Sequence, residues 1–210
     1  MKEMKFALPP FAYFSPDEWN RCGAEYDEIR AAALGWDVTD FGSGDFYSVG
    51  LLLFTVRNGV QGSSAYSKPY AEKIMIVEEN QVTPYHFHNY KTEDIINRGG
   101  GVLLMKVYNS TPEGTLADTE VKISKDGRAL TLPAGSVIRI EVGESVTVPT
   151  GLYHSFWAEA GSGKVLCGEV SMTNDDCADN RFLDPTGRFP EIEEDEAPLY
   201  LLANEIPPAK

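Results

Sequence analysis

The sequence predicts an all-β fold, built as a single barrel with a helix at its N-terminal end and a covering segment at its C-terminal end. Short apolar segments follow one another through the middle of the chain, and turn-forming residues separate them. No helical pattern lies between these segments, which argues against a parallel α/β sheet. The chain has 210 residues, of which 42% are hydrophobic and 24% charged, so it can bury the core of one such barrel.

Residues 1–50 are expected to form an extension packed on the barrel. Ser15 fits an N-cap, Pro16 the first helical position and Glu18 the end of a capping box. Apolar residues then recur at spacings of three and four, and Gly35 follows the last of them. The pattern, formed by Trp19, Cys22, Tyr26, Ile29 and Ala33, predicts one packing helix.

Residues 51–173 are expected to form the barrel. The predicted strands are 51–58, 73–77, 82–88, 102–109, 121–124, 137–142, 145–149 and 165–172. Turns are predicted at 97–101, 112–114, 126–127 and 161–163. Residues 174–210 belong to the same domain as a covering segment, polar at first, then acidic, then apolar. We expect this segment to be partly helical and to close one end of the barrel.

Charge and composition exclude several classes of partner. The chain has 18 Lys and Arg against 32 Asp and Glu, a net charge of −14 that would repel nucleic-acid phosphates and anionic membranes. It has no apolar run long enough to span a bilayer and no signal-peptide pattern. The three cysteines, Cys22, Cys167 and Cys177, are unpatterned, which favours a reducing cytoplasm.

The histidines indicate a metal site. On a strand, residues i and i+2 point to the same face, so the imidazoles of His86 and His88 converge while Phe87 points away. Glu93 follows across a probable bend and could add a carboxylate oxygen, and His154 is the third and last histidine of the chain. Imidazole and carboxylate without thiolate suit a divalent ion with open coordination positions, such as manganese, iron, cobalt, nickel or zinc.

Two motifs around these residues resemble those of the cupin superfamily. His86, His88, Glu93 and Gly100 match the spacing of the first cupin motif. Gly143, Pro149, Gly151 and His154 match the second, which departs from the pattern only where Ala158 replaces the usual Asn. The resemblance implies a jelly-roll-like cupin barrel in which His86, His88, Glu93 and His154 bind the metal.

Further segments resemble the D-lyxose isomerase family. They are 36–46, 50–59, 73–93, 148–157 and 168–182, so the resemblance covers nearly the whole chain. It implies a cytoplasmic homodimer that uses a divalent metal, most often manganese. It further implies interconversion of D-lyxose with D-xylulose, and of D-mannose with D-fructose.

Such an isomerase must move a proton between C2 and C1, which requires a base. Lys73 shares a strand face with Met75 and is a candidate base or proton donor. Glu169 lies within an apolar strand and is a candidate base or sugar ligand, since an unpaired buried carboxylate would be costly. Asp179, at the predicted barrel mouth, and Glu191, in the acidic run, complete the candidate catalytic set.

Substrate contacts are predicted around the ligands and the barrel mouth. Asp176 and Arg181 could bind the hydroxyls of an open-chain sugar, Tyr85 flanks a ligand, and Trp157 could offer an apolar face to the sugar carbons. Thr83 has the strand parity of Tyr85 rather than that of His86, so it is expected to lie outside the site.

Other readings are a cupin phosphosugar isomerase, a cupin dioxygenase and a non-catalytic sugar-binding cupin. A phosphosugar enzyme needs a cationic phosphate site, and Lys91, Arg98 and Arg181 do not form a tight basic cluster in the sequence. A dioxygenase could use a three-histidine, one-glutamate iron site, but the polar stretch 174–181 favours a polyol substrate instead. A binding module would have no turnover to lose on substitution of Lys73.

Overall fold

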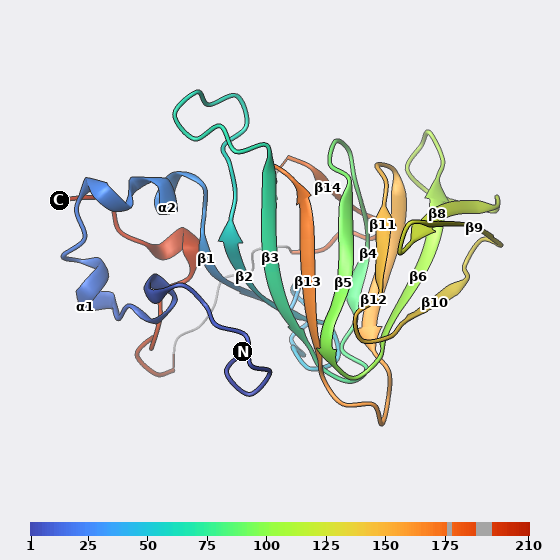
Figure 1. Cartoon of the computed structure of the whole chain (residues 1–210), viewed down its shortest axis with the longest axis horizontal. Helices are drawn as coiled ribbons and strands as arrows, with labels where there is room; N and C mark the ends of the chain where they lie inside the picture. Colours follow the sequence, from blue (N-terminus) through green and yellow to red (C-terminus); the bar gives the residue numbers. More distant parts are fainter. Residues whose placement is uncertain (176–177, 188–194) are drawn as a thin grey trace.

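The computed structural model describes residues 1–175, 178–187 and 195–210, and it consists of two antiparallel sheets folded against each other (Figure 1). The larger sheet has the strand order β1 (Gly35–Thr39), β2 (Leu51–Arg57), β3 (Tyr70–Val77), β13 (Val165–Met172), β5 (Glu93–Gly100), β11 (Ser145–Val148), β8 (Val121–Lys125) and β9 (Arg128–Leu132). The smaller sheet has the order β10 (Val137–Ile140), β6 (Leu103–Ser110), β12 (Leu152–Ala158), β4 (Thr83–His88) and β14 (Asn180–Phe182), and β7 (Leu116–Ala117) pairs with β6. The predicted all-β, jelly-roll-like cupin barrel is confirmed.

The main hydrophobic core fills the space between the two sheets. It draws alternate residues from both, such as Met75 and Ile95 from the larger sheet and Met105 and Phe156 from the smaller one. Alternation follows from the strand period of two, which sends successive side chains to opposite faces. The same rule places alternate residues of β3 and β13, such as Lys73 and Glu169, at the centre of the barrel, where the candidate site lies.

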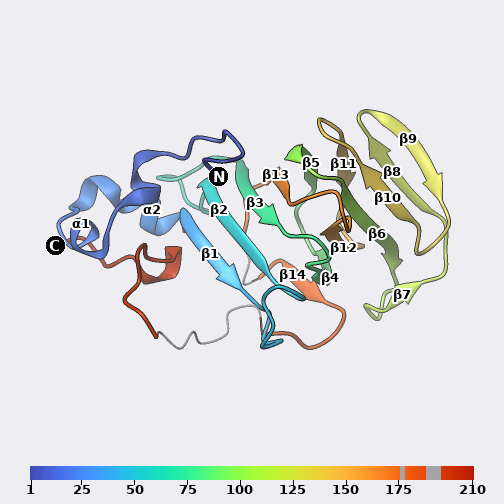
Figure 2. The ribbon, with the colours of Figure 1, turned by 90° about the horizontal axis from the view of Figure 1, so that it is seen from below.

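A second apolar cluster covers the outer face of β2 and β3. Phe54, Ile74 and Ile76 point away from the barrel and pack beneath Leu8 and Ala12 of the N-terminal segment. This segment includes η1 (Pro10–Tyr13) and lies along the sheet at the helical end of the molecule (Figure 2). Burial on both faces explains why the sequence of these two strands is apolar almost throughout rather than alternating.

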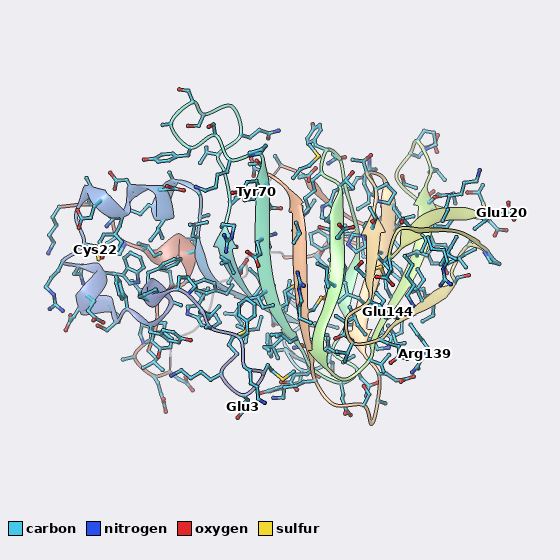
Figure 3. All side chains as sticks on the ribbon, viewed as in Figure 1. Glu3, Cys22, Tyr70, Glu120, Arg139 and Glu144 are labelled. Atoms are coloured by element: carbon cyan, nitrogen blue, oxygen red, sulfur yellow. The ribbon has the colours of Figure 1, made fainter. Side chains whose placement is uncertain are left out.

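The single N-terminal helix predicted from the sequence is wrong. The capping box is present, with Ser15 N donating to Glu18 Oε2 at 2.8 Å, but α1 spans only Pro16–Trp19. The chain continues as η2 (Ala24–Tyr26) and α2 (Asp27–Ala31). Gly23 has an extended backbone that separates the short helices, a break that glycine permits because it is a poor helix former. Cys22 lies at this helical end of the molecule (Figure 3).

The turn predicted at 97–101 is also largely wrong, because β5 runs through to Gly100. A register shift opposite Leu166 and Cys167 bends the strand there. At Gly100, with φ of +91°, a Cβ atom would lie 2.2 Å from the carbonyl oxygen of Lys164, so only glycine fits. Strands β1, β9 and β12 likewise had no counterpart among the predicted segments.

The C-terminal segment divides into two described parts. β14 pairs with β4 beside the site, whereas residues 195–210 lie against the N-terminal region, where Leu202 bridges to Trp36 (Figure 2). The only helical element described there is η3 (Ala203–Glu205), and β14 extends the edge of the smaller sheet beside β4. Among the described residues, no helix is long and apolar enough to cross a membrane.

We expect Phe54→Ala to lower the free energy of unfolding by about 3–5 kcal/mol, because it empties a fully buried site between Phe11 and Trp36. Chemical denaturation measures this change. Leu199→Ala is the control, because Leu199 is 73% exposed and its loss should cost under about 0.5 kcal/mol. Equal effects of the two substitutions would contradict the packing of the N-terminal segment on the sheet.

Candidate active site

A pocket between the sheets gathers a set of polar residues, most of which are buried. Its polar lining consists of Lys73, Thr83, His86, His88, Lys91, Glu93, Glu169 and Asn180. Its apolar lining consists of Phe41, Leu51, Leu53, Met75, Ile95, Phe156 and Phe182. These residues come from strands distant in sequence, so the pocket exists only when both sheets have formed.

The three histidines meet at one point. His86 and His88 share a face of β4, and β12 pairs with β4 so that His154 lies directly opposite His86. The ring centroids of His86 and His154 are 4.2 Å apart, and one nitrogen from each of the three rings lies within 4.8 Å of the others. All three side chains are buried.

Backbone carbonyls orient two of these rings. The Nδ1 atom of His86 lies 2.8 Å from Pro84 O, and that of His154 lies 3.1 Å from Leu152 O. A carbonyl oxygen only accepts, so each Nδ1 carries the proton and each Nε2 presents a lone pair. Burial and the neighbouring His154 and His88 hold the pKa of His86 well below its usual value, which keeps the ring neutral and able to bind a metal.

Glu93, the first residue of β5, completes the cluster. One carboxylate oxygen lies 3.2 Å from His88 Nε2 and the other 3.2 Å from His154 Nε2. Burial acts to raise the pKa of Glu93, but the neighbouring His88 and Lys91 outweigh it and hold that pKa well below its usual range. Buried nitrogens and an ionised carboxylate that converge in this way fit a divalent metal ion.

Beside this cluster lies a chain of buried charges. Lys91 Nζ is 3.0 Å from Glu93 Oε2 and 2.9 Å from Glu169 Oε1, and Lys73 Nζ is 3.6 Å from the same Glu169 oxygen. Lys73 and Glu169 are cross-strand partners in the β3–β13 pair, which explains their proximity. The side chains of all four residues are at most 8% exposed.

Polar neighbours hold these charges in place. Lys91 Nζ also donates to Asn174 Oδ1 at 2.9 Å, and Asn174 is fixed by two hydrogen bonds between its backbone and the Asn58 side chain. Ser171 Oγ donates to Glu169 Oε1 at 3.1 Å. Within the described part of the chain, the hydrogen bonds of the Glu169 carboxylate therefore all involve Oε1, and Oε2 is left for a ligand.

Lys91 is the functional residue that the sequence analysis missed, since it considered Lys91 only as a phosphate-binding cation. A signal was present in the sequence. Lys91 lies two residues before Glu93, so in an extended segment the two side chains point to the same face. Its ion pairs with two carboxylates depend on tertiary contacts and have no sequence signature.

Asp179 lies behind the site rather than in its lining. Its carboxylate accepts hydrogen bonds from Tyr90 N at 2.6 Å and Lys91 N at 3.4 Å, and Oδ2 is 3.8 Å from His88 Nδ1. These contacts fix the turn that connects His88 to Lys91. Asp179 is therefore placed to position His88 and Lys91.

Three of the predicted substrate contacts lie outside the pocket lining. Tyr85 faces the other side of β4, where its ring lies against Tyr108, and Trp157 is one position out of phase with Phe156, which does line the pocket. Arg181 lies over the outward-facing ring of Phe87 and donates to the carbonyl oxygen of Glu113. Asp176 and Glu191 lie outside the described residues.

The expectation that Thr83 lies outside the site is wrong. The β4–β12 register shifts between the pairs His86–His154 and Thr83–Phe156, so Pro84 and Tyr85 together oppose one residue of β12. This β-bulge reverses the parity and turns Thr83 into the pocket. Pro84 was the available signal, because proline within a strand often marks a bulge.

Comparisons with known proteins show the family of this chain. A family model described as D-lyxose isomerase matches residues 1–206. The D-lyxose/D-mannose isomerase of Serratia proteamaculans is 52% identical over 199 residues, covering 94% of this chain and 87% of the relative. The protein of the same name from Escherichia coli O157:H7 is 51% identical, covering 94% and 88%.

Solved structures resemble the fold at low sequence identity. Acinetobacter sp. DL28 L-ribose isomerase in complex with L-ribose has a TM-score of 0.55 at 16% identity, covering 90% of this chain and 88% of that one. Cellulomonas parahominis L-ribose isomerase with L-ribose has a TM-score of 0.53 at 17% identity, covering 89% of each. From the family match and the sequence identity, the chain belongs to the D-lyxose isomerase family and is a sugar isomerase.

Proposed function

We propose that this isomerase interconverts D-lyxose with D-xylulose, and D-mannose with D-fructose, by proton transfer between C2 and C1. The names of its two relatives support these substrates. The observation that carries the mechanism is the pairing of Glu169 with Lys91 in the pocket that His86 and His88 also line, next to His154. The homodimer and the cytoplasmic location implied by the family resemblance belong to the same proposal.

His86, His88, Glu93 and His154 are the proposed ligands of a divalent metal, most often Mn²⁺ in this family. When bound, such an ion polarises the sugar carbonyl and stabilises negative charge on its oxygens. Binding of this kind requires neutral imidazoles and an ionised carboxylate, and the lowered pKa values of His86 and Glu93 described above agree with this requirement.

Glu169 is the proposed base. Its Oε1 atom is held by Lys91 and Ser171, so the carboxylate is oriented, and Oε2 is left to accept the C2 proton and return it to C1. Lys73 and Lys91 place two ammonium groups next to this carboxylate, where they can hydrogen-bond sugar oxygens and move a proton between them. Asp179 is a proposed positioning residue, because it holds the backbone of Lys91.

The predicted roles of Asp176 in sugar binding and of Glu191 in acid–base chemistry remain part of this proposal. Arg181 and Trp157 lie outside the pocket lining, so their predicted contacts with the sugar have no support from the structure. The phosphosugar alternative loses support from the structure. Lys91 is neutralised by Glu93 and Glu169, and Arg181 is engaged with the carbonyl of Glu113, so neither is placed to bind a phosphate dianion.

The first experiment is ketose formation from D-lyxose and D-mannose by chelator-stripped protein, with and without added Mn²⁺. We expect turnover of both sugars that depends on the metal, because the two share their configuration from C2 to C4. Colorimetric detection of D-xylulose and fructose measures it. Turnover of phosphorylated sugars alone, or of no sugar with any divalent metal, would overturn the proposed function.

We expect Glu93→Gln to weaken Mn²⁺ binding at least tenfold, because the amide removes the one negative charge among the four proposed ligands. Titration calorimetry on the stripped protein measures the affinity. Glu120→Gln is the matched control on the exposed surface of the barrel (Figure 3), and it should bind Mn²⁺ as the unchanged chain does. Equal affinities of the two variants would contradict the assignment of Glu93.

We expect Glu169→Gln to lower kcat by about 10²- to 10⁴-fold, the range that general acid–base groups contribute. Mn²⁺ affinity should change little, because Glu169 is not among the proposed ligands. The assay is run in deuterated water, where the unchanged enzyme should place solvent deuterium in the product. A variant that keeps full turnover would exclude Glu169 as the base.

A further inference from the structure

Thr83 is a buried polar side chain with no function in the mechanism above. It is 3% exposed, and its Oγ1 atom has no hydrogen-bond partner among the described residues. Leaving a hydroxyl unpaired in an apolar interior costs about 1–3 kcal/mol, so natural structures usually avoid it. The hydroxyl of Thr83 lies in the wall of the active-site pocket, where a bound ligand can pair with it.

The structure holds Thr83 in this position from both sides. Ser155 Oγ donates to the carbonyl oxygen of Thr83 at 2.8 Å, which fixes the bulged part of β4 against β12. On the other side, Val82 N donates to Ser48 O at 2.9 Å and Gly50 N donates to Val82 O at 3.2 Å. The backbone is therefore fixed, and Thr83 reaches the pocket only because the bulge at Pro84 and Tyr85 reverses its direction.

The place of Thr83 indicates which part of a ligand it meets. The charged groups of the pocket gather around His86, His88 and Glu93, at and beyond the C-terminal end of β4. Thr83, the first residue of β4, lies opposite Phe156, and His86 lies opposite His154. The two partners are two residues apart on β12, so Thr83 and His86 are separated by roughly 7 Å along the strands. It therefore lies on the side of the pocket away from the reacting groups.

We propose that Thr83 is a specificity residue, whose Oγ1 hydrogen-bonds a hydroxyl of the sugar chain on the part that extends away from the histidines. The inference rests on the proposed function, because a polyol is the ligand that presents such a hydroxyl. The ligand group that pairs with Thr83 Oγ1 is a neutral hydroxyl rather than an anion, because a single threonine hydroxyl brings no positive charge. The bond is made in ground state and transition state alike, so it contributes to KM rather than kcat.

The test compares Thr83→Val, Thr83→Ser and Thr147→Val. Valine has the shape of threonine without the hydroxyl, and serine keeps the hydroxyl without the methyl group. Thr147 is the matched control, because its Oγ1 already donates to Asp94 at 2.5 Å on the outer face of the sheet. The probes are D-lyxose turnover and calorimetric binding of D-arabinitol, the alditol of D-lyxose, to the Mn²⁺-loaded protein.

For Thr83→Val we expect KM for D-lyxose and Kd for D-arabinitol to rise about tenfold with little change in kcat. Its Tm should be unchanged or higher by about 2 °C, because an unpaired buried hydroxyl is replaced by a methyl group. Thr83→Ser should bind the alditol within about threefold of the unchanged chain. Thr147→Val should show the opposite pattern, with a lower Tm and unchanged KM and Kd.

If the unchanged chain turns over D-lyxose, two results would overturn the inference about Thr83 without affecting the proposed function. In one, Thr83→Val keeps the KM and Kd of the unchanged chain. In the other, it loses affinity together with Tm, which would show that the hydroxyl supports the fold. An unchanged chain that neither converts D-lyxose nor binds D-arabinitol would overturn the proposed function and, with it, the polyol as the ligand of Thr83.

Discussion

The burial of two lysines and two glutamates side by side is the constraint on which the site depends. Each ion would cost several kcal/mol if it were removed from water alone, so Lys73, Lys91, Glu93 and Glu169 are tolerable in the barrel only as a mutually neutralising set. Such a set needs rigid surroundings, which the Asn58–Asn174 contacts and Ser171 provide. The same rigidity orients the Glu169 carboxylate through its Oε1 atom and leaves Oε2 without a hydrogen bond to the described residues.

The pairing of the strands turns this constraint into a pocket. Antiparallel register places Glu169 opposite Lys73 and His154 opposite His86, so each functional pair lies on one inner face. The outer face of β3 is covered by the N-terminal segment, which keeps Ile74 and Ile76 from water while Lys73 and Met75 point inward. The N-terminal segment therefore helps to hold one wall of the candidate site, and Phe41, also from residues 1–50, contributes to the pocket lining.

Departures from regular structure account for most differences between expectation and structure. A bulge at Pro84 and Tyr85 brings Thr83 inward, and a register shift opposite Leu166 and Cys167 carries β5 through the predicted turn at Gly99 and Gly100. Strand alternation does not predict which face a side chain occupies at such points, because one extra residue reverses the direction of every side chain beyond it. In the sequence, the only indications of these irregularities were the proline and glycine residues within the strand segments. Which way the chain would bend there was decided by the neighbouring strands.

The sequence by itself determined the barrel class, the family and the convergence of His86 and His88, because strand alternation and motif spacing are local properties that a single segment carries. Tertiary structure alone decided that Lys91 joins Glu93 to Glu169, that Asp179 supports the turn behind His88, and that Arg181 and Trp157 face away from the pocket. These outcomes depend on register between strands far apart in the chain and on the cost of leaving a buried charge unpaired. Both are set by the whole fold rather than by any one segment.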